Sequence, residues 1–340
     1  MSELMDVVVC DQPGELTFGQ RTIPQRSPDE ILIRVRRVGI CGTDMHIYRG
    51  TQPYLSYPRV MGHEIAGEVV EAPSTAKVRP ADPVFVMPYL NCGRCAACCK
   101  NKPNCCMNLQ VLGVHRDGAL AQYLSVPAHC AFVADGISLD QAAMIEFLAI
   151  GAHAVRRSQL QGHQRVLVSG AGPIGMACAL FATLAGAEVT VFDLRETRLA
   201  FCRERLKVAR AMTPRDASDQ ELRNATDGEM FDVVFDATGN AAAMQSGFNF
   251  IAHGGTYVLV SVVTADIAFS DPEFHRREAT LMGSRNATAE DFETVLHAMR
   301  AGQIPTHDLN THETSLAQLP GVLPSWMDPN AGVIKGIVHC

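Results

Sequence analysis

The stretch Val166-Leu167-Val168-Ser169-Gly170-Ala171-Gly172-Pro173-Ile174-Gly175 is the most informative part of this 340-residue sequence. An apolar run typical of a buried strand leads into a glycine-rich turn, and the apolar segment from Met176 to Leu184 predicts a helix. Gly170 and Gly172 allow the tight turn and let backbone N–H groups approach a pyrophosphate, while Gly175 permits close packing of helix and strand. The stretch therefore predicts a dinucleotide-binding unit, against the alternative of an ordinary tight turn.

The acid that follows this stretch bears on the choice of nucleotide. The next strand ends at Asp193, 18 residues after Gly175, where a carboxylate can accept hydrogen bonds from ribose hydroxyls and repel a 2′-phosphate. This favours NAD, although the nearby Arg195 and Arg198 could hold the extra phosphate and leave NADP as the alternative. The residues expected at the cofactor site are Gly170, Gly172, Pro173, Ile174, Gly175, Asp193, Arg198, Thr238 and Ser261.

The two parts of the chain before and after about residue 150 predict different secondary structure. After Gln164, β-rich runs alternate with helical stretches, which predicts βαβ units and a parallel sheet. The first 150 residues instead hold short strands, such as Ile31 to Arg36 with its alternating apolar residues. Within the region after Gln164, the polar segment from Ala209 to Glu229 is expected to be loop and short helix. Thr288, with Asp291 three residues on, predicts the start of a last helix.

Composition limits the class of protein. Hydrophobic residues make up 47% of the chain, and 29 basic against 36 acidic residues give a net charge of -7. This balance argues against a nucleic-acid binder, which normally carries a positive surplus. No apolar stretch approaches the roughly 20 residues that a membrane span needs. We therefore expect a globular, cytoplasmic protein with no nucleic-acid or membrane partner.

The cysteines are unevenly placed. Six of the twelve fall within 15 residues, and in a reducing cytosol such clusters favour metal binding over disulfides. Four of them have the spacing of a closed tetrahedral zinc site, which has no open position and is structural. These four are Cys92, Cys95, Cys98 and Cys106. Cys99 and Cys105 lie beside the set, so the replacement of one ligand by a neighbour stays open.

A second set of candidate metal ligands is dispersed along the chain. Cys41, His63 and Glu146 together offer one thiolate, one imidazole and one carboxylate. Such a set neutralises Zn²⁺ and leaves a fourth position for an alcohol oxygen. Taken singly, each of these residues is more often a packing, capping or surface residue.

Taken together, these motifs resemble the zinc-dependent medium-chain alcohol and polyol dehydrogenases. The resemblance rests on Gly39-Ile40-Cys41-Gly42-Thr43-Asp44-Met45-His46, on Gly62-His63-Glu64-Ile65-Ala66-Gly67, on the four-cysteine segment and on Gly170 to Gly175. It implies a mixed α/β protein with two domains. The first is a GroES-like β-rich catalytic domain over residues 1–154, with a structural zinc lobe at about 89–108. The second is a Rossmann NAD-binding domain over residues 155–286, with a doubly wound parallel sheet. It also implies that residues 287–340 return to the catalytic domain, that the active cleft lies at the domain junction, and that the protein is a homodimer or homotetramer.

The resemblance also assigns roles to residues at the metal. It implies that Cys41, His63 and Glu146 bind the catalytic zinc, which makes two Zn²⁺ per chain with the structural one. Glu64 matches a residue that approaches or joins the metal in relatives. Asp44 matches an acid that orients the ligand histidine and raises its basicity.

Two further residues match a path for the substrate proton. Thr43 matches the hydroxyl that takes the proton, and His46 matches the group that passes it to water through the nicotinamide ribose. For His46, a hydrogen-bonded loop histidine is the alternative.

Other stretches resemble the sugar-acid branch of this family, whose substrates are aldonates such as L-galactonate. They are Phe269 to His275, Gly283 to Thr288, and Tyr57-Pro58-Arg59-Val60. The expected reaction is hydride transfer from a secondary alcohol of a polyol or sugar acid to NAD⁺, and Arg285 could meet either a substrate carboxylate or the cofactor. Phe147 departs from the family pattern, which commonly has proline there. The alternatives are a dehydrogenase of simple alcohols or amino-alcohols, a zinc-free reductase on the same scaffold, and a zinc-ribbon binding protein.

Overall fold

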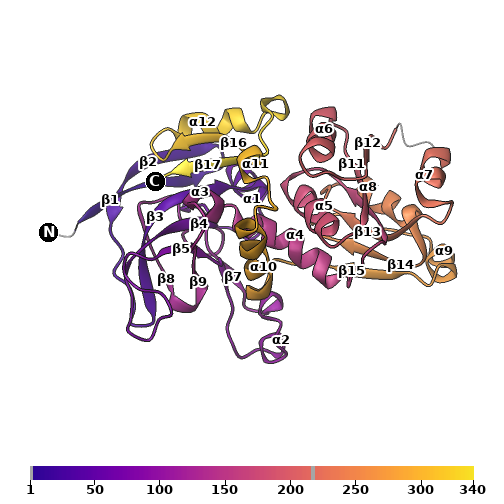
Figure 1. Ribbon diagram of the computed structural model, residues 1–340. Coiled ribbons are helices and arrows are strands. Elements are labelled where there is room, and N and C mark those ends of the chain that lie inside the picture. Colours follow the sequence, from indigo (N-terminus) through magenta and orange to yellow (C-terminus); the bar gives the residue numbers. More distant parts are fainter. Residues whose placement is uncertain (1–2, 216–218) are drawn as a thin grey trace. The chain divides into compact units, whose positions relative to one another are not determined.

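The computed structural model describes residues 3–215 and 219–340, and these form two compact units. One unit, here called the β-rich unit, runs up to Glu146 and also includes Thr288–Cys340. The other, called the α/β unit, consists of Phe147–Ala287. The β-rich unit is therefore built from two separate parts of the chain, drawn in indigo to purple and in yellow in Figure 1.

The β-rich unit is organised around a seven-stranded sheet. Its strands follow the order β16-β17-β3-β4-β5-β9, and β8 pairs with β3 off this path. Strand β17, from the end of the chain, pairs antiparallel with β3, so the C-terminal part completes this sheet. The strands are β3 (Glu30–Ile40), β4 (Glu64–Glu71), β5 (Pro83–Val86), β8 (Tyr123–Pro127), β9 (Ala131–Val133), β16 (Asn310–Ser315) and β17 (Lys335–His339).

Side-chain alternation explains the long strand at the centre of this sheet. Ile31, Ile33 and Val35 are buried in the core while Arg34 is exposed, as the sequence pattern predicts for a strand with one wet face. Two antiparallel two-stranded sheets accompany this sheet. They are β1 (Leu4–Gln12) with β2 (Glu15–Thr22), and β6 (Tyr89–Leu90) with β7 (Gln110–Val111).

Short helices connect the strands of the β-rich unit. They are α1 (Gly42–Arg49), α2 (Ala96–Cys99), α3 (Leu139–Ala142), α10 (Ala289–Arg300), α11 (Thr306–Leu309), α12 (Leu319–Trp326) and the 3₁₀ turns Pro103–Cys105, Ala128–Cys130 and Pro329–Ala331. The helix predicted from Thr288 is confirmed as α10, but it is not the last, because α11 and α12 follow it. The backbone N–H and the hydroxyl of Thr288 both donate to Asp291 at 2.8 Å, which closes a capping box.

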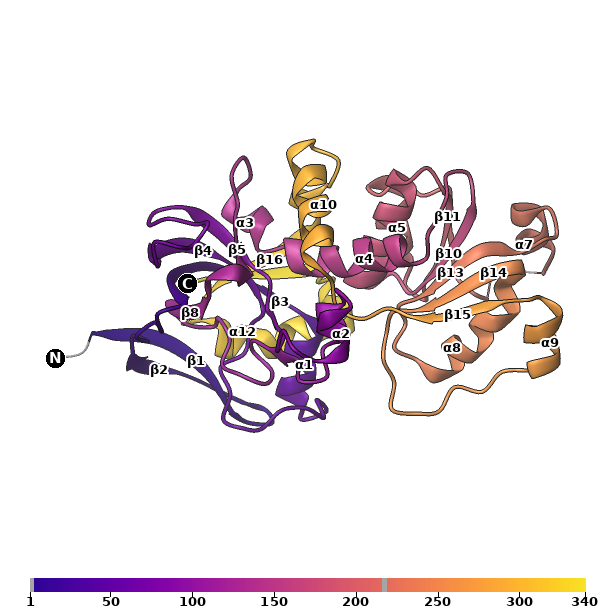
Figure 2. The same cartoon turned by 90° about the horizontal axis from the view of Figure 1, so that it is seen from below.

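The α/β unit contains a six-stranded parallel sheet with the order β12-β11-β10-β13-β14-β15. The order reverses between β10 and β13, which is the switch point where ligands bind in such sheets. In Figure 2, α5 and α8 lie on opposite sides of the sheet. The strands are β10 (Arg165–Ser169), β11 (Glu188–Phe192), β12 (Arg210–Met212), β13 (Phe231–Asp236), β14 (Ile251–Leu259) and β15 (Thr280–Gly283).

The helices of this unit follow the βαβ pattern. They are α5 (Pro173–Leu184), α6 (Glu196–Glu204), α7 (Asp219–Thr226), α8 (Ala241–Gly247), the 3₁₀ turn Phe248–Phe250 and α9 (Asp271–Arg276). Helix α4 (Ile145–Arg157) begins in the β-rich unit and continues into this one. The expectation of loop and short helix from Ala209 to Glu229 was wrong at β12, and residues 216–218 of that segment lie outside the described residues. No helix in the described part of the chain has both the length and the apolar character needed to span a membrane.

Candidate active site

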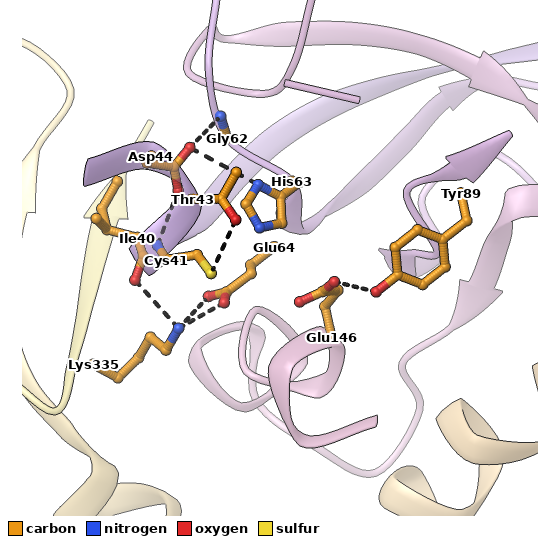
Figure 3. A network of polar contacts seen from close by, with 10 residues as sticks. All are labelled: Ile40, Cys41, Thr43, Asp44, Gly62, His63, Glu64, Tyr89, Glu146 and Lys335. Carbon is orange, nitrogen blue, oxygen red and sulfur yellow. Dashed lines mark hydrogen bonds and ion pairs between the residues drawn. The ribbon is translucent and has the colours of Figure 1, made fainter. Parts of the chain in front are cut away.

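Three potential metal-binding side chains meet where β3 and β4 lie side by side (Figure 3). Cys41 follows the last residue of β3 and caps α1, while His63 and Glu64 stand at the start of β4. Antiparallel pairing places Gly39 opposite Glu64, so residues distant in sequence come together. One ligand atom from each of Cys41, His63 and Glu64 lies within 4.8 Å of the other two.

Asp44 connects the two segments that carry these side chains. It is fully buried in α1, and its Oδ2 accepts a hydrogen bond from the Cys41 backbone N–H at 2.9 Å. Its Oδ1 accepts from the Gly62 N–H at 3.1 Å and lies 3.8 Å from Nδ1 of His63. The carboxylate therefore sits where it can fix the His63 ring once the ring carries a proton on Nδ1.

Glu146 lies beside this group but outside the three that come within 4.8 Å. It stands in the first turn of α4, is 3% exposed, and accepts a hydrogen bond on Oε1 from the Tyr89 hydroxyl (Figure 3). Burial raises the pKa of Glu146, while the charge of His63 opposes that rise. Glu64 therefore stands closer to Cys41 and His63 than the carboxylate expected there from sequence.

Lys335 is a functional-site residue that the sequence analysis missed. Its Nζ lies 2.6 and 2.7 Å from the two carboxylate oxygens of Glu64 and donates to the Ile40 carbonyl at 3.2 Å. Burial alone would lower the pKa of Lys335, but the charges of Glu64 and Cys41 raise it. The only signal in the sequence is a lysine inside the apolar run from Val333 to Val338, because lysine is almost never fully buried unless it is paired.

These residues fit a divalent cation of the zinc type. Among the described residues, the buried Oε2 of Glu146 has no hydrogen-bond partner, and an unsatisfied buried polar atom costs about 1–3 kcal/mol. Burial opposes protonation of His63, but Asp44 and Cys41 raise its pKa well above the ordinary value. Thiolate, imidazole and carboxylate are the donors that Zn²⁺ takes in catalytic sites.

The four cysteines predicted to form a structural site also come together. One ligand atom from each of Cys92, Cys95, Cys98 and Cys106 lies within 4.8 Å of the others, and Sγ of Cys95 lies 3.5 Å from that of Cys98 and 3.9 Å from that of Cys106. The neighbouring thiol of Cys99 instead donates to the Arg94 carbonyl at 3.6 Å and is exposed, as is Cys105. The geometry thus selects one register among the six clustered cysteines.

Backbone groups prepare this segment for thiolates. Hydrogen bonds from the backbone of Arg94 and Cys95 lower the pKa of Cys92 to about 6. The backbone N–H of Cys92 lowers the pKa of Cys106, but burial and the adjacent thiols raise it to about 11. Hydrogen bonds from the backbone of Cys98 and Met107 also lower the pKa of Cys95. Two thiols of the cluster therefore ionise readily while Cys106 resists, and a bound cation would favour the thiolate of Cys106 as well.

The glycine-rich turn has the geometry that its sequence predicts. Gly170 has a φ of +91°, and Gly172 caps α5, whose first residues are Pro173 and Ile174. A Cβ on Gly175 would lie 1.7 Å from the Gly170 carbonyl oxygen, so only glycine fits there. The turn and the helix N-terminus together form the arrangement that binds a pyrophosphate in dinucleotide-binding proteins.

The side chains expected around the nucleotide differ in their surroundings. Asp193 accepts hydrogen bonds from the Ala171 N–H at 2.7 Å and the Arg195 N–H at 2.9 Å. Arg198 is buried, with Nη1 3.4 Å from the Ala171 carbonyl, and burial lowers its pKa to about 10. Arg198 thus lies behind the glycine-rich turn and not in solvent.

Thr238 and Ser261 share a partner that the sequence did not reveal. Their hydroxyls donate to Asp236 at 3.0 and 2.8 Å, and Asp236 is fully buried at the end of β13. Burial raises the pKa of Asp236 although both hydroxyls oppose the rise. The two predicted cofactor residues therefore converge on one buried carboxylate at the switch point of the sheet.

The predicted proton-path residues lie on α1. Oγ1 of Thr43 is 4.0 Å from Sγ of Cys41, which places this hydroxyl next to the donor group. His46 is exposed, and its Nδ1 lies 2.9 Å from Oγ1 of Thr51. Arg285 is exposed after β15, in the α/β unit.

Comparison with known proteins agrees with this geometry. Residues 27–135 match the family model of the alcohol dehydrogenase GroES-like domain, and residues 173–301 match that of the zinc-binding dehydrogenase. The chain is 44% identical over 335 residues to L-galactonate-5-dehydrogenase of Escherichia coli (strain K12), covering 98% of both proteins.

Two solved structures share the fold over nearly the whole chain. A short chain alcohol dehydrogenase from Escherichia coli CFT073 complexed with cofactor NADH has a TM-score of 0.92 at 28% identity, covering 100% of both chains. A zinc-binding dehydrogenase from Sinorhizobium meliloti 1021 bound to NADP also has a TM-score of 0.92 at 28% identity, covering 99% of this chain and 100% of the other. Fold and site define an oxidoreductase of mixed α/β class, with a GroES-like and a Rossmann-like domain. The chain belongs to the zinc-type, medium-chain alcohol dehydrogenase family.

Proposed function

We propose that this protein oxidises a secondary alcohol of a sugar acid, an aldonate such as L-galactonate, with NAD⁺ as the hydride acceptor. The observation that carries the proposal is the meeting of Cys41, His63 and Glu64 within 4.8 Å. The choice of substrate class is supported by the 44% identity to L-galactonate-5-dehydrogenase. Oxidation of polyols by the same site is the nearest alternative.

Two zinc ions per chain fit the donor sets. Cys41 and His63 would hold the first, with a carboxylate from Glu146 or Glu64. Zinc bound there supplies a Lewis acid that lowers the pKa of an alcohol. The four thiols of Cys92, Cys95, Cys98 and Cys106 would hold the second as a closed structural site, since four thiolates leave no place for substrate.

The residues of α1 supply a path for the proton. Thr43, whose Oγ1 lies 4.0 Å from the Cys41 thiol, would act as a relay: its hydroxyl would accept the substrate proton while donating its own toward His46. His46, which is exposed, would pass the proton to water. Asp44 and Glu64 act by holding the loops and the histidine in place.

The nucleotide site favours NAD over NADP. When bound, the nicotinamide supplies the hydride acceptor. Asp193 presents a carboxylate at the end of β11, where it opposes a 2′-phosphate. Arg198 is buried against the Ala171 carbonyl, which leaves its guanidinium poorly placed to receive an added phosphate.

We further propose a homodimer or homotetramer in the cytoplasm. Strand β15 is an edge of the parallel sheet and exposes Leu281 by 41%, and an open edge strand is a ready site for pairing with another copy. None of the twelve cysteines, all of them in the described part of the chain, forms a disulfide, which fits a reducing compartment. Light scattering coupled to size-exclusion chromatography measures the assembly.

A substrate panel combined with metal analysis tests the proposed activity. The zinc-loaded protein is mixed with NAD⁺ and, in turn, L-galactonate, D-gluconate, sorbitol or propan-2-ol, and NADH absorbance is followed. We expect two zinc ions per chain and turnover of an aldonate, with NADP⁺ a poorer acceptor. Turnover of propan-2-ol alone would refute the sugar-acid assignment and leave a simple alcohol dehydrogenase. No NADH from any of these substrates would refute the proposed activity, and one zinc per chain would refute the proposal of two metal sites.

A further inference from the structure

A cavity in the β-rich unit has a charge pattern that the dehydrogenase reaction does not use. Its volume is about 660 Å³, within the range of small-molecule sites. Three arginines line it from three separate segments: Arg21 from β2, Arg59 from the loop before β4, and Arg116 from the loop after β7. None of the side chains proposed to hold either zinc ion lines this cavity.

One carboxylate is shared between two of these arginines. Oδ2 of Asp117 lies 3.1 Å from Nη1 of Arg21, and Oδ1 lies 3.1 Å from Nη1 of Arg59. Oδ1 also accepts the Val60 N–H at 3.1 Å, so the acceptor capacity of Asp117 is largely used. Nε of Arg59 is buried and has no hydrogen-bond partner among residues 3–215 and 219–340.

The second carboxylate in the cavity is occupied by other donors. Glu30 accepts hydrogen bonds from the Ser27 N–H at 3.2 Å and from the Ser125 hydroxyl at 2.9 Å. Burial opposes ionisation of Glu30, but these bonds and the more distant charge of Arg116 lower its pKa. The cavity therefore holds three guanidinium groups against two carboxylates that are already engaged.

We infer that this cavity binds a small oxyanion, a carboxylate or a phosphate, through Arg21, Arg59 and Arg116. Guanidinium groups present planar pairs of N–H donors that match carboxylate and phosphate oxygens. An anion here supplies the acceptors that Asp117 and Glu30 no longer offer. The inference does not depend on the proposed substrate, because it concerns a different set of residues.

The position of Arg59 links this site to the loop that precedes the metal-binding group. Arg59 forms two backbone hydrogen bonds with Cys10, at 2.8 and 2.9 Å, and the next residue is held by Asp117. Gly62, three residues on, donates to Asp44. A bound anion therefore braces the segment that ends at His63, and we expect slower amide hydrogen exchange over residues 59–62 when the cavity is occupied.

Calorimetric titration tests the inference. Inorganic phosphate and D-gluconate are titrated separately into the full-length, zinc-loaded protein with saturating NADH, which occupies the nucleotide site. The test variant is Arg21→Gln/Arg116→Gln, which leaves the Arg59–Asp117 pair intact. The matched control is Lys77→Gln/Arg79→Gln, which removes the same charge from exposed positions outside the cavity.

We expect the wild type and the control to bind at least one of the two anions with similar affinity. The test variant should bind it at least about tenfold more weakly, because a hydrogen bond to a charged group contributes about one decade or more of affinity. Loss confined to phosphate identifies phosphate as the ligand, and loss confined to gluconate identifies a carboxylate. No binding by the wild type, or equal affinity in the test variant, overturns the inference. If the double variant does not fold, Arg116→Gln alone is used, and its unchanged affinity is equally decisive.

Discussion

At the residue scale, the buried ion pair of Glu64 and Lys335 is the feature with the most direct consequences. Lys335 is 1% exposed and Glu64 is fully buried, and charges in such a place persist only when they are paired. The lysine holds both oxygens of a carboxylate that lies within 4.8 Å of Cys41 and His63. The pair thus holds one oxygen donor in position at the candidate metal site.

Replacing the lysine tests this view. Lys335→Met leaves the Glu64 charge buried without a partner, and we expect the free energy of unfolding of the chelated, metal-free protein to fall by about 3–5 kcal/mol. Denaturant unfolding measures the change. In the zinc-loaded protein the loss should be smaller, because the cation compensates the carboxylate. The double variant Glu64→Gln/Lys335→Met serves as the control and should recover part of the lost stability, and an equal loss with and without zinc would contradict the placement of Glu64 at the metal.

His63 gives a pH-dependent prediction at the same scale. Asp44 and Cys41 raise its pKa well above the ordinary 6.5 despite its burial. In the chelated protein, protonated His63 therefore stabilises the fold fully below pH 6.5, and this contribution is lost as the pH rises through the raised pKa. Zinc needs the neutral imidazole, so zinc affinity should rise over the same interval.

Measurements of stability and of bound zinc on one variant test the role of His63. In His63→Ala, unfolding of the chelated protein should lose this pH dependence, and metal analysis should find one zinc per chain in place of two. NADH binding should be retained, because the glycine-rich turn lies in another unit, while turnover should be abolished. Cys99→Ala, at an exposed thiol outside both donor groups, is the control and should keep both metals. Retention of both metals by His63→Ala would remove His63 from the ligand set.

At the scale of elements, the segment from β6 to β7 depends on its four thiols. Helix α2 has only four residues and none of them is buried, so apolar packing contributes little to this segment. We expect Cys95→Ser to remove one zinc per chain and to make the segment sensitive to limited proteolysis, since a structural zinc contributes folding energy directly. Cys105→Ser, at an exposed thiol outside the cluster, should change neither the zinc content nor the sensitivity to proteolysis. If the segment resists proteolysis as well in Cys95→Ser as in the wild type, the proposed structural role of this zinc is contradicted.

Elements with local signals could be predicted from the sequence, and those without could not. The capping pair Thr288 and Asp291 lies within one turn, so it marks the start of α10 before any tertiary contact is known. Strand β12 has only three residues, is only partly buried, and lies in a polar segment. It exists because β11 offers a parallel edge, and that is a tertiary effect that residues 210–212 do not encode by themselves.

At the scale of the whole molecule, the same distinction applies to the site. The candidate ligand residues of both groups stand in recognisable motifs, and their types together favour zinc. The choice between Glu64 and Glu146 depends on how β3, β4 and α4 are placed, and the sequence does not contain it. Lys335 lies 271 positions from Glu64, so its pairing follows only from β17 joining β3.

The insertion of β17 between β16 and β3 also orders the events of biosynthesis. The α/β unit is one continuous stretch, Phe147–Ala287, and can be completed while translation continues. The first 146 residues leave the ribosome earlier but must wait for a strand that is made almost 200 residues later. Until then the carboxylate of Glu64 has no ammonium partner, and the side of β3 that later receives β17 remains an open edge.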